Sequence, residues 1–356
     1  MKVRTAEQLM IDNLIVKHKA GSHAYGTNIA TSDEDYRGIF VADPVNVRTP
    51  FFKIEEAEDT SEEDTKLYEL ANYMKLALDC NPNVIETLWV DDCDIVHSTD
   101  AYRMLRAHRR DLLSSKIAFT TSGYALAQLK RIKGHNKWIN NPQPENPPVP
   151  KDFLSVVQWL GAEKNLHPDL NLYRDDHRLI PFGNDMYGIV PAKGYQLWDD
   201  KYNKLNHIFE GEREQYSNTY LMVVKWNRDE FNTRLEKWNQ YWSWKKNRNE
   251  TRSELEEHFG YDTKHAMHLV RLLRMGVEAL RDEVILVKRP DAAELLAIRN
   301  GAWKYEDLVA YAEEMDREVR EVWYHKTKLR KKPDIHFAAE LVMRAQDLVW
   351  SNYGYQ

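Results

Sequence analysis

The segment GSHAYGTNIATSDEDYRGIF, residues 21–40, constrains the fold more than any other part of the sequence. The stretch LIVKHKA, which reads as a short strand, precedes it, and an apolar run follows Asp35, so the segment joins two predicted strands. Gly21 and Ser22 fit a tight turn into a short helix over about 23–28, where backbone N–H groups favour an anion. We therefore expect an α/β unit built from strand, turn, helix and strand.

Acidic residues mark the start of the second strand. Asp33 and Asp35 are two residues apart, which puts both carboxylates on one face of an extended chain. Asp64 heads another predicted strand, DTKLY, and its carboxylate can complete the set. Divalent cations such as Mg²⁺ take carboxylate oxygens as ligands and stabilise phosphoryl transfer. Taken alone, the Asp33–Asp35 pair is more often a solvated turn than a metal site.

The rest of the chain shows a change of composition. A proline-rich connector, NNPQPENPPVP, occupies 140–150. Hairpin-like sequence (HRLIPFGND, MYGIVPAKGYQLWD) and a Trp-rich helix over 234–248 follow it, and the chain is helical again from 251 onward. The expected domains are thus 1–139, an insertion at 140–250 and a helical domain at 251–356. Before the connector we expect a strand at 51–57 and helices at 69–79, 99–113 and 117–133; after the insertion we expect helices at 252–259, 261–281, 291–299, 304–322 and 334–349.

A helix within the C-terminal part carries a second group of polar residues. In GYDTKHAMHLVRLLRMG, Lys264, His268 and Arg271 recur at i, i+4 and i+7, on a different face from the apolar stripe. This face can receive triphosphate oxygens, with His265 beside it, or it can be an ordinary solvated surface.

Basic residues also gather at the end of the predicted helix 117–133. Lys130, Arg131, Lys133, Lys137 and Trp138 can follow a phosphate backbone and stack on a base, although a solvated helix end is about equally expected. A second basic stretch, KTKLRKK, lies at 326–332. The net charge of −6 excludes a basic nucleic-acid coat but allows a local basic groove.

Cysteine content and hydropathy indicate the compartment. Two cysteines, Cys80 and Cys93, make neither a disulfide framework nor a zinc pattern. The sequence has no apolar stretch of membrane-spanning length and no signal-peptide pattern at its start, so we expect a cytoplasmic protein that does not bind membranes.

Four blocks together resemble one family. GSHAYG…SDEDYRGIFV, DTKLYELANYMKLALDCNPNVIETLW, GYDTKHAMHLVRLLRMG and RPDAAELLAIRNGAWKYEDL occur in the order seen in predicted nucleotidyltransferases of phages and bacteria that accompany RNA ligases. These proteins are part of the polymerase-beta superfamily. The similarity covers about 20–133 and 258–322, and it does not extend over 140–250. One departure is Glu34, because an apolar residue usually separates the two aspartates.

The resemblance implies a fold, a reaction and roles for residues. The fold class is α+β, with a polymerase-beta-like nucleotidyltransferase core, a C-terminal helical domain and a large insertion. Asp33, Asp35 and Asp64 would bind Mg²⁺ or Mn²⁺ and act catalytically, with Glu62 and Glu63 as alternatives for the third carboxylate. The nucleotide-binding residues would be Gly21, Ser22, Lys264, His265, His268 and Arg271.

The reaction implied is transfer of a nucleoside monophosphate from an NTP, with ATP as the first candidate, to an acceptor hydroxyl with release of pyrophosphate. The favoured acceptor is an RNA end, such as a tRNA under repair, in the host cytoplasm if a phage encodes the protein. Two alternatives stay open. One is transfer to a small molecule or a protein side chain, and the other is a catalytically silent RNA-binding protein with the same fold.

Overall fold

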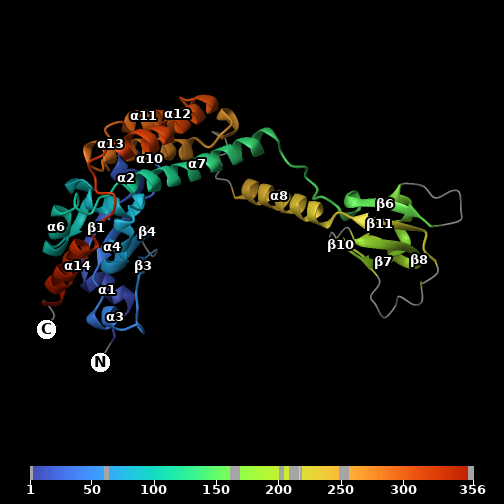
Figure 1. Cartoon of the computed structure of the whole chain (residues 1–356), viewed down its shortest axis with the longest axis horizontal. Coiled ribbons are helices and arrows are strands. Elements are labelled where there is room, and N and C mark those ends of the chain that lie inside the picture. The colour runs from blue at the N-terminus through green and yellow to red at the C-terminus, as the bar shows by residue number, and fades with distance from the viewer. Residues whose placement is uncertain are drawn as a thin grey trace. The chain divides into compact units, whose positions relative to one another are not determined.

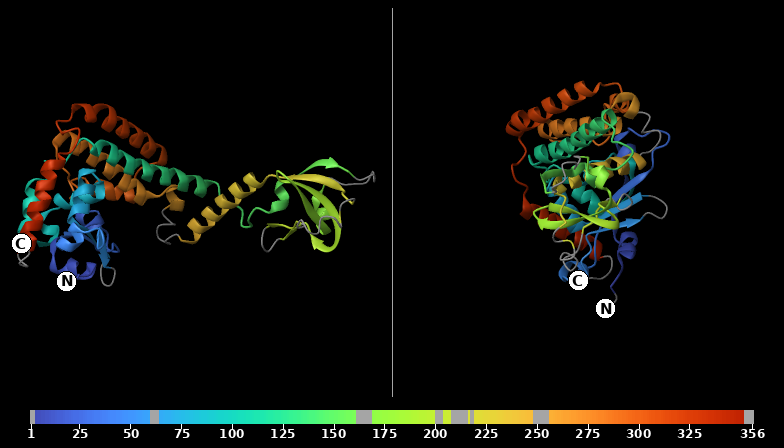
Figure 2. Two further views of the ribbon diagram at one scale, coloured as in Figure 1. Left: turned by 60° about the horizontal axis from the view of Figure 1, so that its bottom comes forward. Right: turned by 90° about the vertical axis from the view of Figure 1, so that its right-hand side faces the viewer.

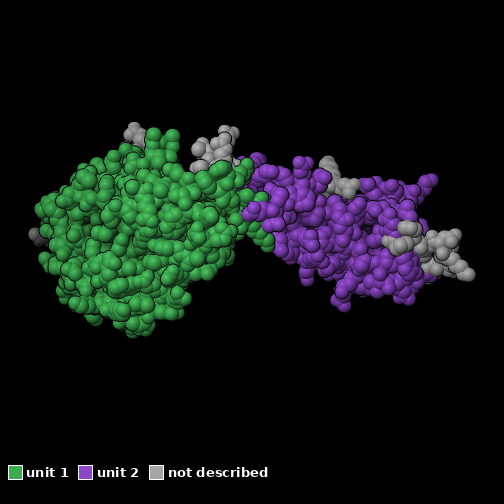
Figure 3. All heavy atoms as spheres, turned by 90° about the horizontal axis from the view of Figure 1, so that it is seen from above, with its two compact units in different colours: residues 1–139, 251–356 green, residues 140–250 purple. Residues whose placement is uncertain are grey.

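The computed structural model describes residues 3–59, 64–160, 169–199, 204–207, 216, 219–247 and 256–351. Two compact units make up the chain: residues 1–139 together with 251–356 form the first, and residues 140–250 form the second (Figure 3). The first unit combines a mixed sheet with many helices, and this confirms the predicted α+β class.

A five-stranded mixed sheet forms the centre of the first unit, in the order β3-β4-β2-β1-β5 (Figure 1). The parallel pair is β2–β4, whereas β1–β2, β1–β5 and β3–β4 are antiparallel. The strands are β1 (Leu14–Lys19), β2 (Asp35–Phe40), β3 (Glu56–Asp59), β4 (Asp64–Glu69) and β5 (Ile95–Ser98).

Helices pack around this sheet, and further helices form a layer next to it (Figure 2). The N-terminal part supplies α1 (Ala6–Asp12), α2 (Gly21–Tyr25), α3 (Pro44–Arg48), α4 (Leu70–Leu78), α5 (Pro82–Ile85), α6 (Asp100–Ala107) and α7 (Ile117–Asn140). The C-terminal part supplies α10 (Thr263–Asp282), α11 (Ala292–Arg299), α12 (Tyr305–Arg317), a π-helical segment (Glu318–Trp323), α13 (Tyr324–Lys326) and α14 (Ile335–Trp350). None of the described helices has the length and apolarity needed to cross a membrane.

Both parts of the first unit share one hydrophobic core. Buried side chains of the sheet, of α4 to α7, of α10 to α12 and of α14 belong to a single cluster. Helices α7 and α10 lie side by side (Figures 1 and 2), and Gly276 allows their close approach because a Cβ there would lie 2.5 Å from Thr121 Oγ1. The last helix returns to the sheet, where Trp350 Nε1 donates to the Ala42 carbonyl over 3.0 Å.

Local sequence signals explain where several elements begin. Thr5 and Gln8 form a capping box at α1, and Glu69 caps α4 through the amides of residues 71 and 72. Asn81 caps α5, with Pro82 as its first residue. The strand predicted at 51–57 is wrong: the strand is Glu56–Asp59, because Phe51 and Phe52 are exposed and residues 51–55 form no ladder with β4.

The second unit contains a four-stranded antiparallel sheet in the order β6-β11-β8-β7 and a long helix, α8 (Arg228–Lys246). The predicted hairpin is β7–β8, and Asn184 and Asp185 make its turn with φ of 51° and 58°. Trp238 and Trp242 of α8 both donate their indole N–H to the carbonyl of Pro144, so these rings hold the proline-rich connector. The remaining elements are β6 (Leu154–Trp159), β7 (Asp175–Gly183), β8 (Met186–Gln196), β9 (Trp198–Asp199), β10 (Lys204–Leu205) and β11 (Met222–Trp226).

Candidate functional site

Three carboxylates lie at one edge of the first unit's sheet, where β2 and β4 begin. Asp35 is the first residue of β2 and Asp64 is the first residue of β4, and the parallel register pairs these two positions directly. Asp33 precedes Asp35 by two residues and is exposed, as is Asp64. The carboxylate oxygens of the three aspartates do not all lie within 4.8 Å of one another. The rivals Glu62 and Glu63 lie outside the described residues.

The electrostatics of Asp35 show which groups are near it. Burial raises the pKa of Asp35, and the charges of Asp64 and Asp33 raise it further, while Arg37 and Lys264 lower it. Each additional negative charge disfavours ionisation, which is the effect of carboxylates that share a site. A divalent cation would relieve this repulsion, and an all-oxygen donor set fits a hard cation. The residues present therefore fit Mg²⁺ or Mn²⁺.

Glu34 does not compete with the two aspartates that flank it. Its carboxylate accepts hydrogen bonds from the Tyr36 hydroxyl at 2.7 Å and from Lys19 Nζ at 3.1 Å. The Tyr36 hydroxyl, followed by Lys19, lowers the pKa of Glu34. Glu34 thus forms surface contacts with Lys19 and Tyr36 and is not part of the group of three aspartates.

The Gly21–Ser22 turn contacts Asp35 closely. Gly21 has a φ of 57°, and a Cβ there would lie 2.6 Å from Asp35 Oδ2. The Ala20 amide donates to the Asp35 carbonyl at 2.8 Å, which fixes the turn against β2. Ser22 is the second residue of α2, and its carbonyl accepts from Thr27 N at 2.9 Å. Glycine is required here because any side chain would displace the carboxylate.

Helix α10 brings two cations to the same region. Lys264 is exposed and acts on Asp35 electrostatically. Arg271 is only 5% exposed, and its guanidinium carbon lies 3.8 Å from the ring centroid of Tyr25. Its Nε has no hydrogen-bond partner in the described part of the chain. A buried arginine in this state is suited to bind an anion.

The two histidines of α10 have different surroundings. His265 is partly buried, and its Nδ1 lies 2.5 Å from Asp262 Oδ2. Burial, together with the charges of Arg271 and Lys264, lowers the pKa of His268 to about 3. His268 is therefore a neutral imidazole near pH 7. The face that carries it runs from the exposed Lys264 through the partly buried His268 to the buried Arg271.

Residues beneath the site were not predicted from the sequence. Glu86 is fully enclosed and accepts from the Tyr25 hydroxyl at 2.9 and 3.0 Å and from Arg37 Nη1 at 3.2 Å. Burial raises the pKa of Glu86, whereas Arg37 and Arg271 lower it. This network supports Tyr25, on which Arg271 stacks. One sequence signal for Arg37 was its position two residues after Asp35, which puts both side chains on one face of β2.

The residues predicted to contact nucleic acid lie on α7. Lys130, Arg131, Lys133 and Lys137 are exposed, and Lys133 pairs with Glu313 at 3.0 Å. Trp138 stacks on His135, with ring centroids 5.8 Å apart. In the second basic stretch, Lys331 donates to the Tyr324 carbonyl and Arg330 pairs with Asp334, so part of this stretch is engaged locally.

A cavity of about 480 Å³ lies away from the aspartates. Residues of α3, of the following loop and of the start of α4 line it, including Asn46, Lys53, Glu69 and Lys75. Glu69 ends β4, whereas Asp64 begins it, so the two features are at opposite ends of this strand.

Residues 2–140 match the model of RlaP, described as the RNA repair pathway DNA polymerase beta family. No curated protein and no solved structure matches the chain. The resemblance stated from the sequence motifs is thereby confirmed for this part of the chain, which contains Gly21, Ser22, the three aspartates and the basic residues of α7. The family implies a polymerase-beta-type nucleotidyltransferase of RNA repair.

Proposed function

We propose that this protein transfers a nucleoside monophosphate from an NTP to the hydroxyl of an RNA end, with release of pyrophosphate. The observation that carries the proposal is the register of β2 and β4, which sets Asp35 beside Asp64 at one sheet edge. Asp33 and Lys264 act on the same carboxylate. Carboxylates for metal and a cation for phosphate thus occur together within one unit.

Each residue has a role in this proposal. Asp33, Asp35 and Asp64 would hold Mg²⁺ or Mn²⁺, which supplies charge stabilisation for phosphoryl transfer. The acceptor oxygen bonds to the α-phosphorus, the bond from that phosphorus to the pyrophosphate oxygen breaks, and the hydroxyl proton passes to a carboxylate. Asp35 is the candidate acceptor of this proton because its carboxylate interacts with both Asp33 and Asp64.

Phosphate binding would involve side chains of α10 and backbone amides of the Gly21–Ser22 segment. Lys264 and Arg271 provide charge-assisted hydrogen bonds to the triphosphate, and His268 contributes as a neutral donor. The Gly21–Ser22 turn adds backbone amides next to Asp35. Arg271 supports this assignment most strongly because it is buried with an unpartnered Nε.

A transfer assay tests the proposal. The protein is incubated with Mg²⁺ and each α-labelled NTP, ATP first, together with tRNA, a protein mixture or buffer alone. We expect label on RNA and equimolar pyrophosphate. Label on protein, or on a small molecule, would replace RNA as the acceptor. No labelled product with any acceptor would favour a catalytically silent RNA-binding protein.

The acceptor surface is tested separately. Reversal of Lys130, Arg131 and Lys133 to Glu should weaken RNA binding, with a smaller salt dependence, and leave NTP affinity unchanged. Arg344→Glu, at an exposed position of α14, is the matched control. Equal RNA affinity of the triple variant and the wild type at low salt would remove this surface from the proposal.

A further inference from the structure

The basic segment, residues 326–332, runs from the end of α13 toward α14 and carries a dense group of positive charges. The sequence has no acidic residue from 322 to 333. Arg330 pairs with Asp334 at 2.8 Å, and part of the segment therefore has a local partner. In a chain with a net charge of −6, the segment is still a local excess of positive charge. Its exposed cations are Lys326, Lys328, Arg330, Lys331 and Lys332.

The backbone of the basic segment is held against the rest of the first unit. The side chain of Leu329 is 9% exposed and belongs to the main hydrophobic core. The Ser115 amide donates to the Arg330 carbonyl at 2.9 Å, and Lys331 Nζ donates to the Tyr324 carbonyl at 2.5 Å. Cations on a fixed segment lose less conformational freedom on binding than cations on a mobile loop. The segment is therefore a preformed surface for an anion.

A second group of cations lies on α6 and on the turn that follows it. Three of these arginines pair with carboxylates, and in each pair at least one partner is well exposed. Exposed pairs of this kind are weak, so a phosphate can replace the carboxylate. The Arg109 guanidinium lies 4.8 Å from the Trp89 ring centroid and makes no ion pair with the residues that the structure describes. Together the side chains of Arg103, Arg106, Arg109 and Arg110 line a hollow of about 350 Å³.

The turn over residues 108–115 joins the two groups of cations. It begins directly before Arg109 and ends at Ser115, which bonds to the basic segment. The ring of His108 packs edge-on against Phe337 of α14, with centroids 5.2 Å apart, and α14 packs against α6 (Figure 1). The four arginines and the basic segment are therefore neighbours, and together they are called the basic surface.

The arginine side of the basic surface lies toward the sheet end that carries Asp35. Arg106 donates to the Val90 carbonyl at 2.7 Å, shortly before β5 begins. The start of β5 pairs with the end of β1, and the end of β1 pairs with the start of β2 next to Asp35. A polyanion with one end at the aspartates can thus continue past β1 and β5 toward the arginines.

We propose that the basic surface binds the sugar–phosphate backbone of the RNA acceptor, at nucleotides away from its reacting end. Repeating phosphates match a row of cations, and their neutralisation releases counterions. Phe119 is 46% exposed and lies in edge contact with Tyr324, beside the basic segment, so its ring offers a face on which a base can stack. Arginine forks and an exposed aromatic ring favour RNA over an acidic protein. The inference rests on the proposed function for the identity of the acceptor.

Equilibrium binding of labelled tRNA to the full-length protein, without NTP or divalent metal, tests the basic surface. Lys328→Glu/Lys332→Glu should weaken binding at least about tenfold at about 0.1 M salt and reduce its salt dependence. The melting temperature should not change, because other groups hold the backbone of the segment. The control Lys53→Glu/Lys304→Glu alters the net charge equally at exposed positions elsewhere, and it should bind tRNA normally.

Two further variants test the other parts of the surface. Arg109→Gln should weaken tRNA binding without a change in NTP affinity, because it removes one guanidinium from the hollow. Phe119→Ala should also weaken tRNA binding, and Phe119→Tyr should restore it, since tyrosine keeps an aromatic face for stacking.

The outcomes separate this inference from the proposed function. The inference is wrong if wild type binds no tRNA, if Lys328→Glu/Lys332→Glu binds tRNA like wild type, or if the control variant weakens binding equally. Polyglutamate that competes as well as RNA would indicate an acidic protein partner instead. In the transfer assay, Lys328→Glu/Lys332→Glu should raise KM for RNA and leave kcat and KM for NTP unchanged. Binding that depends on Lys328 and Lys332 in a protein without transfer activity would overturn the proposed function but support this surface.

Discussion

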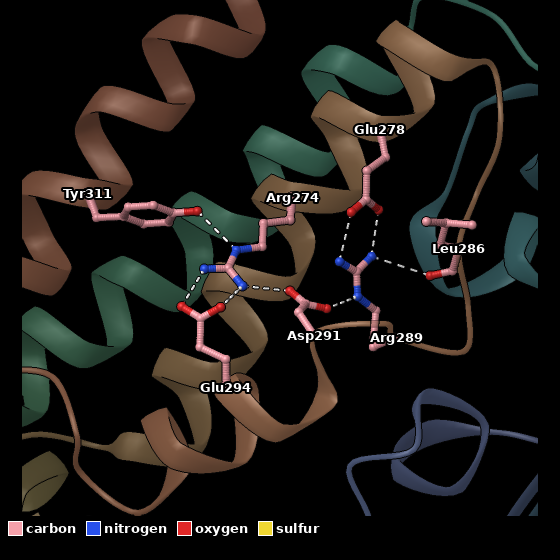
Figure 4. Close-up of polar contacts among 7 residues, drawn as sticks. All are labelled: Arg274, Glu278, Leu286, Arg289, Asp291, Glu294 and Tyr311. Carbon is pink, nitrogen blue, oxygen red and sulfur yellow. Dashed lines mark hydrogen bonds and ion pairs between the residues drawn. The ribbon is translucent and has the colours of Figure 1, made fainter.

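Arg289→Met should destabilise the first unit strongly, because Arg289 is the centre of a buried ion-pair network (Figure 4). Its side chain is 1% exposed. The guanidinium donates to both oxygens of Glu278, at 2.6 and 2.8 Å, and through Nε to Asp291 at 2.8 Å. Arg274 shares Asp291 and also pairs with Glu294. The substitution keeps most of the volume but leaves Glu278 without its buried cation.

The expected magnitude follows from burial. Removing one partner of a buried ion pair costs about 3–5 kcal/mol, because the other charge is left uncompensated. Asp291 retains Arg274 and Glu278 is only partly enclosed, so we expect about 3 kcal/mol. For a domain of this size, that loss lowers the melting temperature by about 6–12 °C.

Thermal and urea unfolding of the full chain measure the effect. Arg281→Ala is the matched control, since Arg281 pairs with Asp282 on the same helix but both are half-exposed. Such a surface pair contributes about 1 kcal/mol or less. The double variant Arg289→Met/Glu278→Gln should lose less stability than the sum of the losses in the two single variants, because both changes remove the same ion pair. If Arg289→Met costs no more than Arg281→Ala, the network does not hold α10 and α11 together as argued.

Three further predictions concern the site and its support. Gly21→Ala should lose at least about 1–2 kcal/mol of stability and most activity, because of its positive φ and the contact with Asp35, whereas Gly123→Ala, which meets nothing within 4 Å, should be neutral or stabilising by equilibrium unfolding. Lys264→Ala should weaken NTP binding about tenfold to a hundredfold in calorimetric titration, without a change in melting temperature; unchanged affinity would remove Lys264 from the site. Burial lowers the pKa of His18 to about 4, so protonation favours the unfolded chain, and stability should fall as the pH drops below about 6.5. Protonation of this histidine alone should lower the free energy of unfolding by about 1.5 kcal/mol between pH 6.5 and 5. His18→Gln should make the free energy of unfolding, measured by urea denaturation, less dependent on pH over that range; an unchanged pH dependence would contradict the assignment.

Periodicity predicted the elements whose two faces differ. β2 and β4 were recognisable because burial alternates over the first four residues of each strand, and each begins with an exposed or half-exposed aspartate. The β7–β8 hairpin carries the Asn184–Asp185 turn signal, and α10 has a clear apolar stripe. The strand predicted at 51–57 was wrong because the prediction relied on aromatic residues, which favour strands. Phe51 and Phe52 instead lie exposed in a loop. Local propensity could not reveal that no strand pairs with them.

The sequence pattern could not predict contacts between residues that are far apart in the chain. Arg271 looked like one residue of a polar helix face, but its burial depends on Tyr25 and Glu86, which are far away in the chain. Likewise, His135 and Glu256 are separated by the whole insertion along the chain, yet their side chains lie within 4.8 Å of each other. The register of Asp35 with Asp64 is a property of strand pairing, so the sequence could suggest the two residues without showing that they are neighbours.

The most direct test of the central claim compares Asp35→Asn with Glu34→Gln in the nucleotidyl-transfer assay. Asp35→Asn keeps the shape of the side chain but removes the charge that would hold the metal ion and accept the proton. Glu34→Gln removes the neighbouring carboxylate, which contacts Lys19 and Tyr36 instead. We predict that pyrophosphate release and labelled product are lost in Asp35→Asn while its melting temperature stays at or above that of the wild type, and that Glu34→Gln remains active. Near-wild-type transfer by Asp35→Asn would contradict the account.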